Sequence, residues 1–182
     1  DSYQRRLFAE DAAHGFAFID LCRKRYDAAV MNPPFGDFSV SYRTDSKSNY
    51  INSSNDILGA CGERGLSAWL PRGLVGAVTS RAWLCLSPFS NWREKVILNR
   101  NSPILIADIG SAVMDGAVVE AAAYVIQSEA SSIPSLCIRA LGKKESELLI
   151  KSSIAKIQKG TLPTEVYAIN PFSFSAVPGS PL

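Results

Sequence analysis

Asn32-Pro33-Pro34-Phe35 is the stretch of this sequence whose residue types and order point most directly to chemistry. Each proline fixes φ at about −65° and lacks a backbone donor, and the first proline also keeps Asn32 out of the α region. The carboxamide of Asn32 offers an acceptor oxygen, which can take a hydrogen bond from an aromatic amine, while the ring of Phe35 stacks on the heterocycle. The motif therefore predicts a rigid turn that binds a planar amine.

Alkylation of such an amine depends on position and electrostatics more than on a strong base. The lone pair of the adenine amine is delocalised into the ring, and acceptors that hold both amine hydrogens favour sp³ character at the nitrogen. We predict that these acceptors are the side-chain oxygen of Asn32 and the backbone carbonyl of Pro33. A base inside a duplex must be flipped out to reach them and would then stack on Phe35. The alternative is a turn that ends a strand, with a phenylalanine that belongs to the core.

Alternating apolar and helical patterns indicate the elements that hold this turn. Residues 26–31 form an apolar run without alternation, which predicts a strand buried on both faces. Ligands of α/β sheets bind outside the carboxyl ends of such strands, where Asn32 stands. The whole pattern predicts an α/β fold with mainly parallel strands and a C-terminal antiparallel hairpin. Further strands are expected at 74–80, 104–110, 118–127 and 136–141, helices at 16–25, 56–70, 88–100 and 143–159, a turn at 71–73, a long loop at 38–55, and either a short strand or a helix end at 3–10.

Composition limits the class of protein. With 182 residues, of which 47% are hydrophobic, one domain or a large piece of one is expected. A net charge of +2 is too small to argue for nucleic-acid binding. No apolar run approaches the roughly 18 residues of a membrane helix, and the first residues lack the plan of a signal peptide. The cysteines fit no zinc pattern and are expected to be reduced, buried thiols of a cytosolic protein; they are Cys22, Cys61, Cys85 and Cys137.

Residues 27–36, with Asn-Pro-Pro-Phe at their centre, resemble the catalytic motif of the amino-group DNA methyltransferases that make N6-methyladenine. The resemblance is greatest to the bacterial adenine-specific enzymes of BREX phage defence and of restriction–modification systems. Residues 71–80, 108–119 and 174–182 are similar to later parts of the same family, in the same order. The family implies a class I, Rossmann-like methyltransferase sheet, S-adenosylmethionine as methyl donor, and double-stranded DNA with a flipped adenine as substrate. It also implies the bacterial cytoplasm, with other defence-system subunits as partners and no membrane.

The resemblance implies a role for individual residues. Asn32, Pro33, Pro34 and Phe35 would be the catalytic set, and Phe35 would also line the donor site. The other implied contacts are Asp11 with the adenine of the donor, Tyr42 and Arg43 with the DNA or the target base, and Met114 in place of a second stacking aromatic, with Tyr124 further along. Arg81, which begins the segment after a predicted strand, is either a phosphate contact or a surface arginine.

One departure from the family affects the whole chain. Only 31 residues precede Asn32, and no glycine-rich turn follows a strand among them. We therefore expect residues 1–165 to be the C-terminal portion of a catalytic domain, residues 166–182 to be an exit linker, and the isolated chain to be inactive. Two alternatives remain open: a catalytically silent module that binds DNA or a protein, and an enzyme that methylates glutamine in proteins or guanine in RNA.

Overall fold

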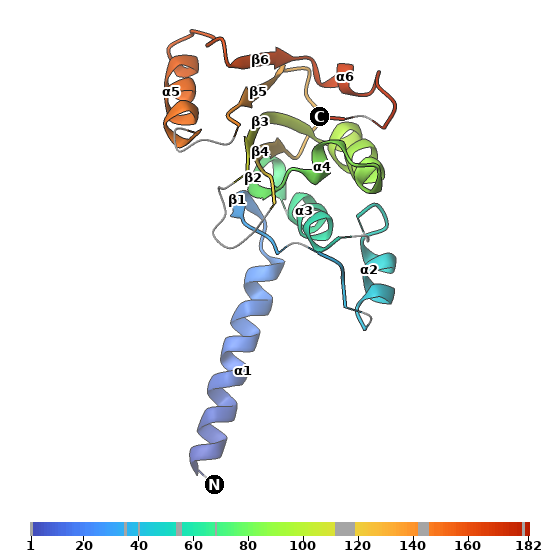
Figure 1. Cartoon of the computed structure of the whole chain (residues 1–182). Coiled ribbons are helices and arrows are strands. Elements are labelled where there is room, and N and C mark those ends of the chain that lie inside the picture. The colour runs from blue at the N-terminus through green and yellow to red at the C-terminus, as the bar shows by residue number, and fades with distance from the viewer. Residues whose placement is uncertain are drawn as a thin grey trace.

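A sheet of six strands in the order β1-β2-β4-β3-β5-β6 forms the centre of the molecule (Figure 1). The computed structural model describes residues 2–34, 36–39, 41–53, 56–67, 69–111, 119–141, 146–179 and 181–182. Four strands run in one direction, while β4 and β6 run in the other. This arrangement confirms the predicted α/β class and its antiparallel pairs in the later part of the chain. The strands are β1 (Tyr26–Met31), β2 (Trp69–Ser80), β3 (Ser102–Gly110), β4 (Ala121–Gln127), β5 (Ser135–Arg139) and β6 (Val166–Ile169).

Helices cover the two faces of the sheet unequally. Alternate residues of a strand point to opposite faces, so Ile106 and its neighbour Ala107 belong to different core clusters. The Ile106 side is covered by α3, α4 and η2, whereas α5 covers the Ala107 side beside β3 and β5. The helices are α1 (Ser2–Arg23), α2 (Arg43–Asn49), α3 (Ile57–Ser67), α4 (Ala82–Cys85), the 3₁₀ turn η1 (Ser87–Phe89), the π-helix η2 (Trp92–Leu98), α5 (Ser146–Gln158) and α6 (Pro171–Phe174).

The β3–β4 hairpin supplies the strand that is inserted in the middle of the sheet. β4 pairs antiparallel with β3 on one side and antiparallel with β2 on the other. Its small residues Ala121 and Ala122 are fully buried between these neighbours. The carboxyl ends of β1, β2 and β3 therefore share one edge of the sheet, and β4 begins at that edge.

The structure corrects the predicted helix and loop boundaries near the N-terminus. The separate segments expected at 3–10 and 16–25 are one continuous helix, α1, in which four alanines favour the helical state. This helix projects away from the sheet (Figure 1). The loop expected at 38–55 contains the short helix α2, where Ser48 and Asn49 donate side-chain hydrogen bonds to carbonyls one turn earlier.

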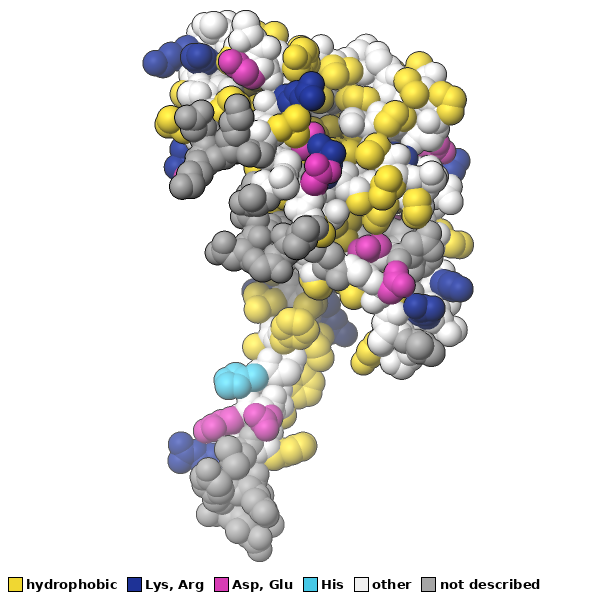
Figure 2. All heavy atoms as spheres, viewed as in Figure 1, with side chains coloured by type: hydrophobic (Ala, Val, Ile, Leu, Met, Phe, Trp, Pro, Cys, Tyr) yellow, Lys and Arg dark blue, Asp and Glu magenta, His cyan; other side chains and the backbone are white. Residues whose placement is uncertain are grey.

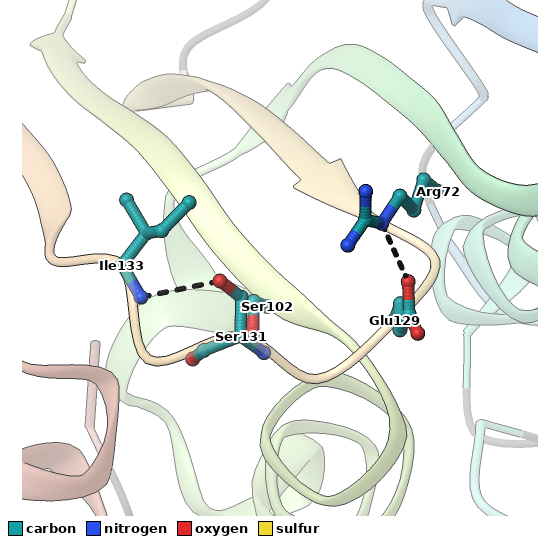
Figure 3. A network of polar contacts seen from close by, with 5 residues as sticks. All are labelled: Arg72, Ser102, Glu129, Ser131 and Ile133. Atoms are coloured by element: carbon teal, nitrogen blue, oxygen red, sulfur yellow. Dashed lines mark hydrogen bonds and ion pairs between the residues drawn. The ribbon is translucent and has the colours of Figure 1, made fainter.

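The turn predicted at residues 71–73 lies inside β2 as a bulge. Tyr26 of β1 pairs with Trp69 but Ala28 pairs with Leu74, so β2 carries extra residues between these two pairs. Arg72 adopts a φ of 65° within the bulge and forms an ion pair of 3.1 Å with Glu129 (Figure 3). The helix predicted at 56–70 is correspondingly shorter, since α3 ends at Ser67.

The segment after β4 is fixed to the start of β3 by serine hydroxyls. The backbone amide of Ser131 donates to Oγ of Ser102 at 2.6 Å, and the amide of Ile133 donates to Oγ of Ser131 at 3.1 Å (Figure 3). These bonds orient the connection that leads into β5.

Residues 166–182, expected to be an exit linker, contain β6 and α6 and pack against the rest of the molecule. The guanidinium of Arg93, 1% exposed, donates to the carbonyl oxygens of Trp83, Leu86 and Gly179 at 2.7–3.1 Å. Burial lowers the pKa of this guanidinium. The amide of Leu182 donates to the carbonyl of Leu84 at 2.8 Å. The division into a catalytic portion and a linker stays a prediction.

Two burial predictions are wrong. β1 is an edge strand rather than a strand buried on both faces, and Val30 is 89% exposed. Cys22 and Cys85 are exposed, whereas Cys61 and Cys137 are half-buried and burial raises the pKa of both thiols. No helix among the described residues has the length and apolar character needed to cross a membrane.

Candidate functional site

The Asn-Pro-Pro turn lies at the carboxyl end of β1, as predicted. β1 ends at Met31, which pairs with Ala77, while β2 continues to Ser80 beyond the turn. Asn32 is exposed and Pro33 is buried beneath it. The carboxamide of Asn32 is thus accessible from solvent on a backbone that proline holds in place. Phe35 lies outside the described residues, so its stacking role stays a prediction.

The N-terminus of α3 anchors the residue that follows this motif. Gly36 has a φ of 115°, a conformation that favours glycine, and its carbonyl accepts a hydrogen bond from the amide of Ile57 at 3.0 Å. The carboxylate of Asp56 accepts hydrogen bonds from the amides of Gly36 and of Leu58, the latter at 2.8 Å. Asp56 therefore caps α3 and holds the end of the turn with the same side chain.

The charge of Asp56 is unfavourably placed despite these hydrogen bonds. Burial is the largest cause that raises its pKa above the ordinary value of 3.8, and the negative charge of Asp37 adds to it. The hydrogen bonds from the two amides lower the pKa of Asp56, but by less than burial and the charge of Asp37 together raise it. Sequence reasoning placed Asp56 inside the helix predicted over 56–70 and missed its role, although an aspartate at the start of a helix is a recognised capping signal.

A network of ion pairs occupies the same edge of the sheet beside the turn. Arg81, at the end of β2, contacts Asp108 of β3 at 3.0 Å and Glu120, just before β4, at 2.5 Å. Its backbone amide also donates to the carbonyl of Glu120 at 2.7 Å. The arginine is half-buried and paired with two carboxylates, so it is not a plain surface residue, and its contact with a phosphate stays a prediction. Its contacts link the carboxyl ends of β2 and β3 to the start of β4.

The remaining predicted site residues are spread over the molecule. Tyr42 is 65% exposed, and Arg43, the first residue of α2, pairs with Asp37 at 3.5 Å. Asp11 lies on α1, which joins β1 at the end opposite Asn32, so the structure does not bring these two residues together (Figure 1). Met114 is outside the described residues. The roles of all four residues stay predictions.

Tyr124 belongs to the core and not to the site edge. It is 2% exposed, and its ring lies 4.5 Å from that of Trp83, edge to face. Burial raises the pKa of its hydroxyl. Stacking of a target base on Tyr124 would require this core to open.

A largely apolar groove of about 610 Å³ runs along β1 between α1 and α3. It extends from Tyr26 at the start of the strand to Asn32 and Pro33 at its end. Arg64 is the one charged residue that lines it among the described residues. A nucleoside-type methyl donor needs polar partners for its ribose hydroxyls and its amino-acid part, and this lining offers few. That the donor site is incomplete stays a prediction.

Comparison with known proteins finds matches of fold but not of sequence. No family model matches the chain, and no curated protein does. A modification subunit assigned to a type I restriction enzyme of Vibrio vulnificus superposes with a TM-score of 0.67 over 83% of this chain and 35% of its own, at 10% identity. A protein of Listeria monocytogenes assigned to the class I S-adenosylmethionine-dependent methyltransferases does so with a TM-score of 0.59 over 74% of this chain and 42% of its own, at 12% identity.

The fold is that of a class I methyltransferase. The type IIL restriction–modification enzyme MmeI, solved in complex with DNA, shares it with a TM-score of 0.52 over 64% of this chain and 17% of its own, at 12% identity. The chain thus spans about a third of the length of the first methyltransferase-fold neighbour and less than half of the second.

Proposed function

We propose that this chain is a portion of the catalytic domain of an adenine-N6 DNA methyltransferase of the restriction–modification or phage-defence type. The observation that carries the proposal is the exposed Asn32 on its proline-fixed turn, at the carboxyl end of a strand in a methyltransferase fold. Similar folds in restriction–modification proteins, one of them solved with DNA, support the choice of substrate.

In this proposal the turn acts by position. The side-chain oxygen of Asn32 and the backbone carbonyl of Pro33 accept the two hydrogens of the adenine amine, and Phe35 stacks on the flipped base. S-adenosylmethionine, when bound, supplies the methyl group. Asp56 keeps the end of the turn fixed through Gly36, which limits the movement of the acceptors. Arg81 keeps the neighbouring strand ends together at the same edge.

Methyl transfer to DNA tests the proposal in two proteins, the 182-residue chain and a longer polypeptide that contains it. We expect methylation of adenine N6 by the longer protein and none by the chain alone, because the groove beside Asn32 offers few polar partners for the donor. Asn32→Ala should lower kcat of the longer protein by at least about a hundredfold, the loss expected for a donor or acceptor at the reacting atom. Leu148→Ala, an exposed position on α5, is the matched control and should change nothing.

Three results would contradict this function. Methyl transfer by the isolated chain would show that its donor site is complete. Full activity of the Asn32→Ala variant would remove the turn from the chemistry. Transfer to glutamine in proteins or guanine in RNA, with none to DNA, would keep the amine chemistry and replace the substrate.

Of the silent modules that would bind DNA or a protein, the apolar lining of the groove favours the one that binds a protein. Calorimetry with S-adenosylmethionine separates the two, since the longer protein would bind the donor only if it is the enzyme.

A further inference from the structure

An apolar pocket of about 410 Å³ lies between α5 and the sheet, away from the edge that carries Asn32. Its floor is a row of paired residues on three neighbouring strands, Val125 of β4, Leu105 of β3 and Leu136 of β5. Leu105 and Leu136 stand near the amino ends of their strands, whereas Asn32 follows the carboxyl end of β1. A ligand in this pocket would therefore leave the candidate site free.

Two walls stand on this floor. One is the last part of α5, where Ile154, Ile157 and Gln158 share a helix face because they are three and four residues apart. The other is the connection that leads into β5, with Ile133 and Pro134. The hollow is thus enclosed by a helix, a connection and the sheet, and differs in this respect from an open sheet face. Apolar side chains also gather at other places on the molecular surface, along the projecting α1 (Figure 2).

Serine hydroxyls hold the connection into β5 in place. The amide of Ile133 donates to Oγ of Ser131, and the amide of Ser131 donates to Oγ of Ser102 at the start of β3 (Figure 3). At the start of β5, Oγ of the fully buried Ser135 donates to the carbonyl of Pro103. This wall is therefore formed before any ligand binds, as is usual in small-molecule sites.

Two side-chain amides are the polar groups of the pocket. Gln127 ends β4 and Gln158 ends α5, and neither side-chain amide forms a hydrogen bond within the part of the chain that the structure describes. The other described residues of the lining are apolar, and none of the lining carries a charge. A carboxylate or phosphate would lose its hydration here with no cation in compensation. The lining thus favours an uncharged ligand whose polar edge can pair with an amide.

We propose that this pocket binds an uncharged aromatic molecule of two fused rings that carries an amide-like edge. An apolar cavity of about 150 Å³ already takes up benzene, so about 410 Å³ has room for two rings and a substituent. Rings fit better than a flexible chain, because they lose fewer rotamers on binding. The rings lie on the row that Leu105 occupies, and the glutamine amides pair with the polar edge. This inference does not rest on the proposed methyl transfer.

Equilibrium dialysis tests the proposal with the longer polypeptide that contains this chain. The probes are naphthalene-2-carboxamide and naphthalene-2-carboxylate, which share their rings and differ in the charge of the substituent. We expect the carboxamide to bind at least about tenfold more tightly, because the carboxylate finds no cation in the lining. Equal affinities would overturn the proposal. So would tighter binding of the carboxylate, or no binding of the carboxamide up to its solubility limit.

Variants of α5 assign the binding to this pocket. Ile154→Trp, at a half-buried position of the lining, fills part of the hollow and should abolish carboxamide binding. Gln158→Leu, at an exposed position, removes one amide and should weaken carboxamide binding about fivefold while unsubstituted naphthalene binds as before. Leu148→Ala, on the same helix but outside the lining, is the control and should change neither affinity.

The two variants can each refute the proposal. Circular dichroism first establishes that Ile154→Trp has a melting temperature no lower than that of the native protein. Native carboxamide affinity in that folded variant would place the ligand elsewhere and overturn the proposal. Native affinity in Gln158→Leu, which leaves the apolar lining intact, would overturn the pairing of the polar edge with this amide.

Discussion

Gly62 of α3 packs against the ring of Trp92, and this contact sets how closely α3 approaches η2. A Cβ at position 62 would lie 2.9 Å from Cζ2 of Trp92. The ring cannot withdraw easily, because Trp92 is fully buried and stands edge-on to Trp83 at 5.1 Å. Gly62→Ala should therefore overpack the core at a cost of about 1–3 kcal/mol, offset by about 1 kcal/mol of improved helix propensity.

The expected net loss is about 1 kcal/mol, which lowers the melting temperature by roughly 3 °C in a protein of this size. Thermal unfolding followed by circular dichroism measures it. Gly15→Ala is the matched control, because its new methyl group meets nothing within 4 Å and should not lower the melting temperature. Trp92→Phe removes the atom that clashes, so Gly62→Ala should cost less in that background. If Gly62→Ala lowers stability equally in the native and Trp92→Phe backgrounds, or does not lower it in the native protein, the contact with Trp92 is not the source of the loss.

Three further tests address the cap of α3, the anchor of the C-terminal segment and the burial of the thiols. Asp56→Ala should cost about 1 kcal/mol by loss of the α3 cap, whereas Asp56→Asn keeps a capping oxygen and should cost less; denaturant unfolding compares them. Because burial raises the pKa of Asp56, the folded protein keeps the proton on this carboxyl to a higher pH than the unfolded chain does. The free energy of unfolding should therefore fall as pH rises between 3.8 and the raised pKa. This part of the pH dependence should vanish in Asp56→Asn. Arg93→Met leaves the carbonyl of Gly179 without its donor and should destabilise by about 3 kcal/mol, with earlier proteolysis of residues 176–182; resistance equal to that of the native protein would contradict this anchor. A thiol reagent under native conditions should label the exposed Cys22 and Cys85 rapidly and the half-buried Cys61 and Cys137 slowly. Rapid labelling of all four thiols would contradict the described burial.

Local sequence signals predicted the strand and the turn that it carries, because both depend on residues close in the chain. An apolar run followed by two prolines leaves the backbone little choice, and Asn32 stands where it was expected. The helix over 88–100 was predicted from Pro88, although Leu86 and not Ser87 is the cap, and the helix is partly of the π type. Sequence patterns do not distinguish an α-helix from a 3₁₀- or π-helix.

Features that depend on distant partners escaped the sequence. The exposure of β1 follows from which strands stand beside it, and an apolar run cannot indicate that one neighbour is absent from the described residues. Arg81 is held by Asp108 and Glu120, which come from two other segments. The bulge at Arg72 is visible only as the local register shift between β1 and β2. Asp56 is the exception, since its capping signal was local.

The position of β4 between β2 and β3 has a consequence for the order in which the protein folds. Gly110 and Ala121 pair across the short hairpin, whereas Leu74 must find Gln127 over a much longer loop. Closing a long loop costs more entropy than closing a short one, so we expect the hairpin to form early and to serve as the template onto which β2 assembles. Among the described residues β1 pairs with β2 alone and β6 with β5 alone, so these two edge strands would join last. The strand that leads into Asn32 would then be among the last pieces of this sheet to be ordered, after the surfaces beside it have already formed.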